Sequence, residues 1–236
     1  MMPQRRWRRA VSKPSPLVPG DYIALWLMAG DATDVTGDYD IGLFGGADQH
    51  EDHVDYDGNN DYGQCARLAF NDNAFTLIML VRFDGFDTDG VWIANSRSDD
   101  DVTAKNEWQL TVFSPASGGL NKPRVSICNT EGTFHSATFN EAIAVGTWYT
   151  VSVRFTGSAV QIFNGLSLQE STEFTGTMNT GSTNTRFARR GWNQESASTV
   201  IHGHLDQSRS IAYDYALSDA ELAATITAIT TGVGLV

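Results

Sequence analysis

The chain has 236 residues and a formal net charge of −12, with 41% hydrophobic and 19% charged residues. This composition is ordinary for a globular protein with an apolar core, and no apolar run is long enough to cross a bilayer. Residues 1–20 hold five basic side chains and no acid, so the remainder carries −17. An acidic body repels phosphates, which excludes nucleic-acid binding by the main part of the chain.

The first apolar segment is "DYIALWLMAG" (21–30). A basic start before a short apolar run is typical of a signal peptide, but this run follows Pro19 and Asp21 and lies late in the chain. We therefore expect a first strand here and no export signal. We also expect two parts, a basic Pro-containing arm over 1–19 and one domain over 20–236.

Strand patterns dominate the rest of the chain, because short β-prone runs alternate with links rich in Gly, Ser, Thr and Asn. In chain order these runs are "AFTLIMLVRF" (74–83), "GVWIANS" (90–96), "EWQLTVF" (107–113), "PRVSICN" (123–129), "GTFHSATF" (132–139), "GTWYTVSVRFTGSAVQIFNG" (146–165), "TRFARRGW" (185–192) and "STVIHGHLDQ" (198–207). One helix is expected at "LSDAELAATITAI" (217–229), where Ser218 and Glu221 form a capping box. The pattern predicts an all-β fold, a two-sheet antiparallel jelly-roll sandwich with one short C-terminal helix and an extended N-terminal arm.

Four passages in the right order resemble the LamG-like (laminin G, concanavalin A-like lectin/glucanase) superfamily. They are "DYIALWLMAG", "DYDGNNDYGQCARLAFNDNAFTLIMLVRFD" (55–84), "GTWYTVSVRFTGSAVQIFNG" and "GHLDQSRSIAYDYALSDAEL". The chain departs from the family pattern at Leu80, where a tryptophan is usual, and at Ser208 and Ser210, where apolar residues are usual. Two extra residues between Leu205 and Leu217 accompany the serines, which predicts a β-bulge or a shifted register there.

Catalysis is not expected. The glucanase branch of the resembled superfamily places acids at alternate positions of one strand, and a glycosidase needs two opposed carboxyls. No strand here has that pattern, and the nearest acids, Glu51, Asp55 and Asp57, lie in a segment that reads as a loop. A divergent glycosidase is the least favoured alternative.

The resemblance implies a structural calcium ion held by oxygen ligands, with Asp206 as the leading candidate. The acidic turns at 84–89 and 99–101 are further candidates, although acids also favour turns for their own backbone hydrogen bonds. As a strand, "HGHLD" places His202, His204 and Asp206 on one face, the ligand set of a non-haem iron site. A pair of solvated histidines is the commoner outcome, and the same holds for His50 and His53 with Asp52. Cys65 and Cys128 can pair, but their spacing is not a zinc motif.

Glycan binding is the expected surface function, because lectins of this architecture use aromatic faces, amides and carboxylates. Trp26 and Trp148 lie in motif positions and are expected in the core. Tryptophans near strand ends are expected to be exposed. The candidate glycan-binding residues are Arg189, Arg190, Trp192, Asn193, Gln194, Trp92 and Trp108.

The sequence of the arm predicts that it acts as a tether, because a basic anchor precedes a Pro-rich spacer. Its candidate partner-binding residues are Arg5, Arg6, Trp7, Arg8, Arg9 and Lys13. By analogy with LamG-like domains of viral decoration, fibre and tail proteins, we expect a structural or adhesion module anchored to a capsid or tail lattice, as a homo-oligomer or in many copies per particle. It would stand on the virion surface or outside cells and touch host glycans. The alternative is a free lectin or the binding module of a polysaccharide-degrading system.

Overall fold

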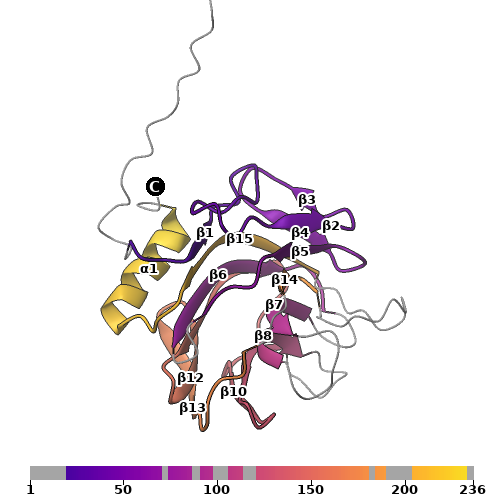
Figure 1. The fold of residues 1–236 in the computed structure, drawn as a ribbon. Coiled ribbons are helices and arrows are strands. Elements are labelled where there is room, and N and C mark those ends of the chain that lie inside the picture. Colours follow the sequence, from indigo (N-terminus) through magenta and orange to yellow (C-terminus); the bar gives the residue numbers. More distant parts are fainter. Residues whose placement is uncertain are drawn as a thin grey trace, which may run out of the picture.

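The structure, a computed structural model, describes residues 20–70, 74–86, 91–97, 106–113, 121–180, 184–189 and 204–232. In these ranges the chain forms two antiparallel β-sheets that pack face to face, with one helix on the outside (Figure 1). The predicted sandwich with a C-terminal helix is therefore confirmed. The predicted arm, residues 1–19, lies outside the described residues. No helix among the described residues is long and apolar enough to span a membrane.

The first sheet contains eight strands. They are β1 (Ala24–Trp26), β3 (Asp48–Gln49), β4 (Val54–Asp57), β6 (Phe75–Phe83), β11 (Trp148–Phe155), β12 (Ala159–Asn164), β13 (Ser167–Glu173) and β15 (His204–Tyr213). Their order is β13-β12-β11-β6-β15-β4-β3, and β1 pairs with β15. The last long strand of the chain thus lies in the middle of this sheet, beside β6.

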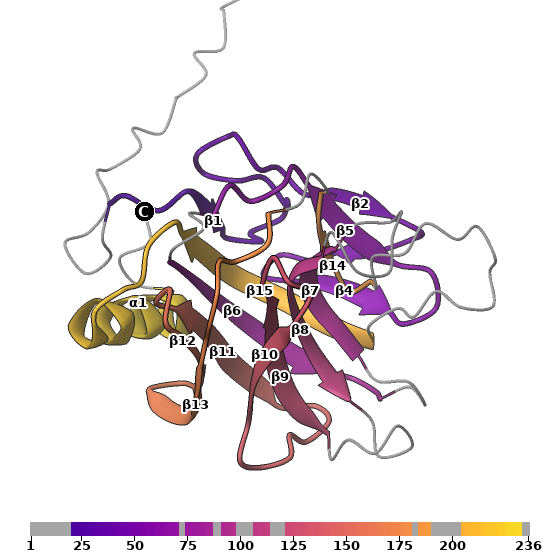
Figure 2. The same cartoon turned by 60° about the horizontal axis from the view of Figure 1, so that its bottom comes forward.

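The second sheet contains seven strands and faces the first sheet (Figure 2). They are β2 (Gly42–Phe44), β5 (Tyr62–Cys65), β7 (Val91–Arg97), β8 (Asn106–Phe113), β9 (Lys122–Cys128), β10 (Phe134–Thr138) and β14 (Thr185–Phe187). Their order is β10-β9-β8-β7-β14-β5-β2. Cys65 and Cys128 are buried thiols, so the disulfide alternative is wrong.

The main core fills the space between the sheets. Alternate residues of each strand point inward, as the period of two requires, and they interlock from both sides. Among the largest fully buried side chains are Trp26, Trp108, Phe75, Phe155 and Phe187. The ring of Trp26 meets that of Phe187 edge-on across the sheets, with centroids 5.5 Å apart. Trp26 is therefore a core residue, as predicted.

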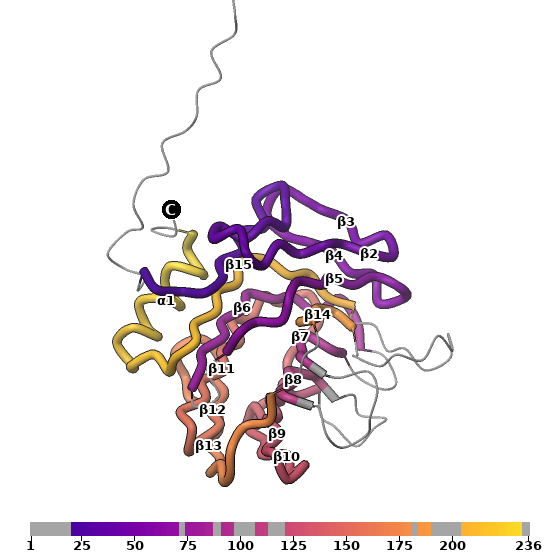
Figure 3. Tube along the Cα trace, in the orientation of Figure 1, coloured from indigo at the N-terminus to yellow at the C-terminus, as the bar shows by residue number. Residues whose placement is uncertain are grey.

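The helix α1 (Asp219–Thr231) covers part of the outer face of the first sheet. Its Leu222, Ile226 and Ile229 are buried against outward-facing residues of β1, β6 and β15, which form a second, smaller core. Figure 3 traces how β1 and α1, from opposite ends of the chain, meet at this corner. The helix thus closes the fold over strands that lie far apart in sequence.

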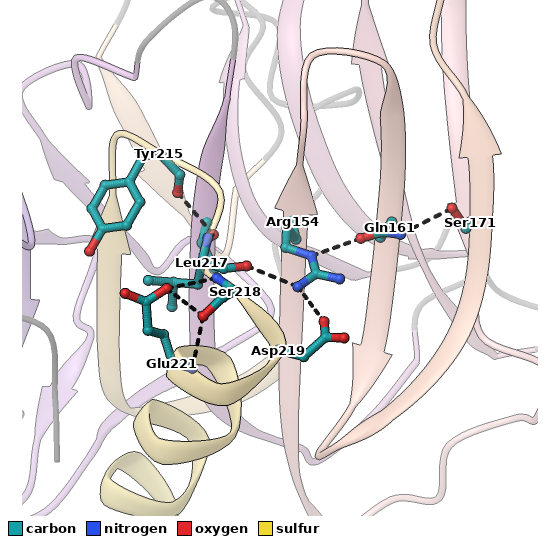
Figure 4. A network of polar contacts seen from close by, with 9 residues as sticks. Arg154, Gln161, Ser171, Tyr215, Leu217, Ser218, Asp219 and Glu221 are labelled. Atoms are coloured by element: carbon teal, nitrogen blue, oxygen red, sulfur yellow. Dashed lines mark hydrogen bonds and ion pairs between the residues drawn. The ribbon is translucent and has the colours of Figure 1, made fainter.

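Polar contacts fix the start of α1 (Figure 4). The Ser218 hydroxyl accepts a hydrogen bond from the Glu221 amide, and the Glu221 carboxylate accepts one from the Ser218 amide at 2.8 Å, which confirms the predicted capping box. Arg154 of β11 donates to the Leu217 carbonyl at 2.9 Å and to the Asp219 carboxylate at 2.7 Å. The helix start is therefore attached to the neighbouring sheet as well as capped.

The predicted irregularity in β15 is a break in register between Gln207 and Ser210. Leu205 packs into the core between the sheets, whereas Ile211 packs under α1 on the opposite face. In a regular strand these two residues would share a face, because they are an even number of positions apart. The irregularity reverses the alternation, and the polar "QSRS" stretch spans the reversal.

Candidate functional site

A row of polar side chains crosses the outer face of the second sheet. Strand register places its members directly opposite one another, in the order Gln64, Arg186, Asn95, Gln109, Ser126 and Ser136. Core residues flank the row along the strands, because alternate positions face the other sheet. Arg186 donates to the Gln64 amide oxygen at 3.3 Å, and the Ser126 and Ser136 hydroxyls lie 2.8 Å apart. Gln64, Arg186, Gln109 and Ser136 are partly exposed and offer amide, guanidinium and hydroxyl groups, whereas Asn95 and Ser126 are buried.

An aromatic stack stands at one end of this row. The rings of Phe44 and Tyr62 are parallel within 11° and their centroids lie 4.8 Å apart. The guanidinium carbon of Arg189 lies 4.3 Å from the Tyr62 ring centroid, and the Arg189 carbonyl accepts a hydrogen bond from Asn95 at 2.6 Å. Phe44 is 43% exposed, so the stack ends in an aromatic surface that faces solvent.

A tight turn positions the stack. Gly45 follows Phe44 with φ of +83°, and a Cβ there would lie 2.2 Å from the Asn60 carbonyl oxygen, so only glycine fits. The Asn60 amide donates to the Gly45 carbonyl at 2.9 Å. This contact joins the turn after β2 to the turn before β5 and so holds Phe44 beside Tyr62.

Basic side chains gather on this face although the whole chain is acidic. Three guanidinium groups lie on it, those of Arg124, Arg186 and Arg189, in a chain of net charge −12. Glu107, an acid of β8 on the same face, is buried and ion-paired with Arg67 at 2.6 Å. Among the described residues, this face therefore carries three guanidinium groups and one buried, ion-paired carboxylate.

The predicted glycan-binding residues have different outcomes. Arg189 is part of the stack, whereas Arg190, Trp192, Asn193 and Gln194 lie outside the described residues. The predicted exposure of Trp92 and Trp108 is wrong, because both are buried. Trp108 points into the core against Phe70 and Phe75, since its position in the alternation of β8, rather than its nearness to a strand end, decides its face. Trp92 lies on the outer side of β7 but has little contact with solvent.

Asp206 lies on the outer face of the first sheet, beyond the part covered by α1. The guanidinium of Arg82 contacts its carboxylate directly, and register places Asp206 between Arg82 and Asp55. Burial, and then the nearby carboxylate of Asp84, raise the pKa of Asp206 to about 6. Carboxylate oxygens of Asp55, Asp84 and Asp206 lie within 4.8 Å of one another.

This group partly fits the predicted calcium. Three carboxylates are the donors that a hard cation takes. The contact of Arg82 with Asp206 already supplies a positive charge there, so an ion would share that carboxylate with a guanidinium. Calcium binding by Asp206 stays a prediction.

The histidines are not among these ligands. The rings of His50 and His53 stack with centroids 4.4 Å apart, and His53 Nδ1 lies 2.7 Å from the Asp52 carboxylate. The described residues contain no group of three ligand atoms at metal spacing that includes either of them. His204 shares the outer face with Asp206 without joining its cluster, and His202 lies outside the described residues.

The predicted burial of Trp148 in the core is wrong. It is 37% exposed on the outer face of the first sheet, opposite Arg82 in the register. The Arg82 guanidinium carbon lies 5.5 Å from its ring centroid, and His53 meets the ring edge-on. Trp148 is the first residue of β11, and α1 does not cover this part of the sheet. Its position in the family motif therefore does not bury it.

Two facing antiparallel sheets with a helix on one outer face define a β-sandwich. A family profile described as the concanavalin A-like lectin/glucanases superfamily, of the laminin G type, matches residues 57–223. The chain belongs to this superfamily, as the sequence resemblance predicted. Among curated protein sequences, none matches the chain.

Solved structures of similar fold include binding domains of botulinum neurotoxins. The receptor-binding domain of the C/D mosaic serotype has 11% identity and a TM-score of 0.65, covering 88% of this chain and 51% of that one. A structure of the type C neurotoxin, whose cell entry is described as dependent upon interaction with two ganglioside molecules, has 12% identity and a TM-score of 0.66. The match covers 89% of this chain and 51% of that one. The serotype D domain in complex with N-acetylneuraminic acid has 10% identity and a TM-score of 0.67, covering 88% and 50%. At such identity the likeness concerns the fold, and this chain spans about half the length of those chains.

Proposed function

We propose that this chain is a non-catalytic carbohydrate-binding module whose ligand lies on the outer face of the second sheet. The observation that carries the proposal is the partly exposed part of the polar row, which ends at the exposed ring of Phe44. These partly exposed members are Gln64, Arg186, Gln109 and Ser136. Amides, hydroxyls and a guanidinium exchange hydrogen bonds with sugar hydroxyls, and an aromatic face packs against the apolar side of a pyranose ring. The named fold relatives that bind gangliosides or N-acetylneuraminic acid agree with this class of ligand.

The preferred ligand is an acidic saccharide. Arg186 and Arg189 bring two guanidinium groups to the end of the row where Phe44 is exposed. A guanidinium binds a carboxylate or sulfate through two parallel hydrogen bonds, which a neutral sugar does not offer. The acidic body of the chain repels anions elsewhere, so this face is where a negatively charged sugar would bind.

A glycan array with the full chain tests the proposal. We expect binding to sialylated, uronic-acid or sulfated glycans and weaker binding to their neutral parents. High salt should weaken the binding, because exposed ion pairs are screened. An array on which the chain binds no glycan of any charge would contradict the carbohydrate-binding function.

We also propose that the module is displayed on a larger assembly such as a virion, with residues 1–19 as its anchor. The support is in the sequence: five basic side chains and a Pro-rich spacer precede a body of charge −17. Deleting residues 1–19 should abolish incorporation into the assembly and leave glycan binding unchanged. Incorporation of the truncated chain would contradict the anchor.

A further inference from the structure

A small pocket opens on the outer face of the first sheet, on the side away from the second-sheet stack. Its volume is about 170 Å³, below the range of sites that enclose drug-sized ligands, so the pocket suits a small ligand group. It lies where β4 and β15 pair, since register places His204 opposite Asp57. The residues that line it are Asp57, Gly58, Gly85, Phe86 and His204.

Two glycines shape this pocket around the imidazole of His204. A Cβ at Gly85 would lie 2.7 Å from His204 Nδ1, and a Cβ at Gly58 would lie 2.7 Å from the His204 Cβ. Gly58 also has φ of +76°, which favours glycine. The turns that follow β4 and β6 therefore approach His204 from both sides because neither carries a side chain at the contact. Phe86 adds an aromatic wall, with its ring stacked on Phe83 of the core.

The surroundings of the pocket are strongly acidic. Asp57 lines it, and the cluster of Asp55, Asp84 and Asp206 shares the same outer face. Two groups face these four carboxylates among the described residues. The Arg82 guanidinium contacts Asp84 at 3.3 Å as well as Asp206, and His53 Nε2 lies 3.8 Å from the Asp206 carboxylate. Burial is the main cause of the raised pKa of Asp206, and the carboxylate of Asp84 raises that pKa further.

A further buried acid adds to the negative field. Asp61 is buried, and its Oδ2 accepts a hydrogen bond from the Asp57 amide at 3.1 Å, while its Oδ1 has no hydrogen-bond partner among the described residues. Its pKa is raised first by burial and then by the carboxylates of Asp57 and Asp55. The turn that forms one wall of the pocket therefore carries negative charge that the described cations do not neutralise.

We propose that this pocket binds the ammonium group of an amino sugar. The carboxylate of Asp57 would pair with the ammonium, the His204 imidazole would exchange a hydrogen bond with a ring hydroxyl, and Phe86 would contact the apolar side of the ring. The saccharide part rests on the proposed function, whereas the preference for a cation follows from the pocket alone. The module then has two sites of opposite preference, an anionic sugar on the second sheet and a cationic one on the first.

Titration of the isotope-labelled full chain with glucosamine, followed by amide and imidazole NMR, tests the proposal. We expect saturable shifts at Gly58, Gly85 and His204, and much smaller ones with N-acetylglucosamine, which has the same ring without the charge. Equal shifts from both sugars, or glucosamine shifts no larger than those from sodium chloride, would overturn it. Ethanolamine separates the two parts of the ligand: weaker shifts than with glucosamine support recognition of the sugar ring, and equal shifts contradict it.

Two variants locate the site. Asp57→Asn keeps the shape of the side chain and should weaken glucosamine binding about fivefold, the upper range for an exposed ion pair. Gly85→Ala places a methyl group against the His204 ring and should abolish the shifts. Asp31→Asn, the same charge change in the turn after β1, should bind as the unaltered chain does. Unchanged binding in both pocket variants would overturn the site.

The same experiment separates this inference from the proposed function. Phe44→Ala should leave the glucosamine shifts unchanged, because Phe44 belongs to the second-sheet stack. Binding of glucosamine by a chain that ignores every acidic glycan would contradict the proposed function and support the pocket. Binding of acidic glycans without glucosamine shifts would support the proposed function and contradict the pocket.

Discussion

The guanidinium of Arg189 lies over the ring of Tyr62, 4.3 Å from its centroid. Tyr62 in turn stacks on Phe44, so one cation and two rings form a continuous column at the edge of the second sheet. A cation over an aromatic face at an accessible site contributes about 0.5–1 kcal/mol, which helps to fix both side chains before a ligand arrives. A prearranged stack lowers the entropic cost of binding, because fewer side chains must be ordered by the ligand.

Replacing Phe44 by Ala should weaken binding of an acidic glycan about tenfold. The substitution removes the exposed aromatic face that packs on the sugar ring and leaves the guanidinium groups in place. Isothermal titration calorimetry measures the change. Leu168→Ala is the matched control, since Leu168 is 46% exposed on β13 of the other sheet. If the two variants bind equally, Phe44 is not part of the site.

The raised pKa of Asp206 predicts a pH dependence of stability. In the unfolded chain the group titrates near 3.8, whereas in the folded chain it titrates at about 6. Between these values the folded state holds more of the proton, so the contribution of Asp206 to the free energy of unfolding falls as pH rises. Asp206→Asn should remove this contribution and flatten the melting temperature between about pH 4 and 6. Asp48→Asn, in the same cross-strand row but 74% exposed, should keep the slope of the unaltered chain. Equal slopes in all three chains would contradict the account.

Replacing Ser218 by Ala should destabilise the fold by about 1 kcal/mol, the usual cost of losing an N-cap. The Glu221 amide loses its acceptor, and the helix covers the outer face of the first sheet only if its first turn forms. Urea denaturation measures the free energy of unfolding. Ser158→Ala, at an exposed serine in the turn between β11 and β12, should cost much less. A cap variant as stable as this control would show that Arg154 alone secures the helix start.

The calcium prediction for Asp206 has a direct test in calorimetric melting. If the carboxylates of Asp55, Asp84 and Asp206 hold an ion, EDTA should lower the melting temperature and added calcium should restore it. Asp84→Asn should then abolish the response to calcium, because it removes one of the three ligands. A melting temperature that neither EDTA nor calcium changes would exclude a structural ion at this group.

The sandwich and its closing helix could be predicted from the sequence because both follow local rules. Strand alternation repeats every two residues, and the Ser218–Glu221 pair marks a helix start within a single turn. The irregularity in β15 was also predictable, since polar residues stand where the family places apolar ones. These features depend on neighbours along the chain, which the sequence displays directly.

The candidate site could be predicted only in part. Arg189 was found because it lies in a stretch of mixed polar and aromatic residues, but Phe44 and Tyr62 lie far from it in the chain. Each member of the polar row is an ordinary alternate position in its own strand, and only the register of six strands shows that they align. Trp148 and the two buried tryptophans were misplaced because motif position and strand ends do not decide which face a residue occupies.

The measurement that tests the central claim most directly is calorimetric titration of a sialylated or sulfated oligosaccharide, chosen from the array, into the full chain and into Arg189→Ala. We predict saturable binding by the full chain and a loss of about tenfold or more in the variant, because a charge-assisted hydrogen bond and the cation over Tyr62 are removed together. Equal affinity of the two chains would contradict a ligand site on the outer face of the second sheet.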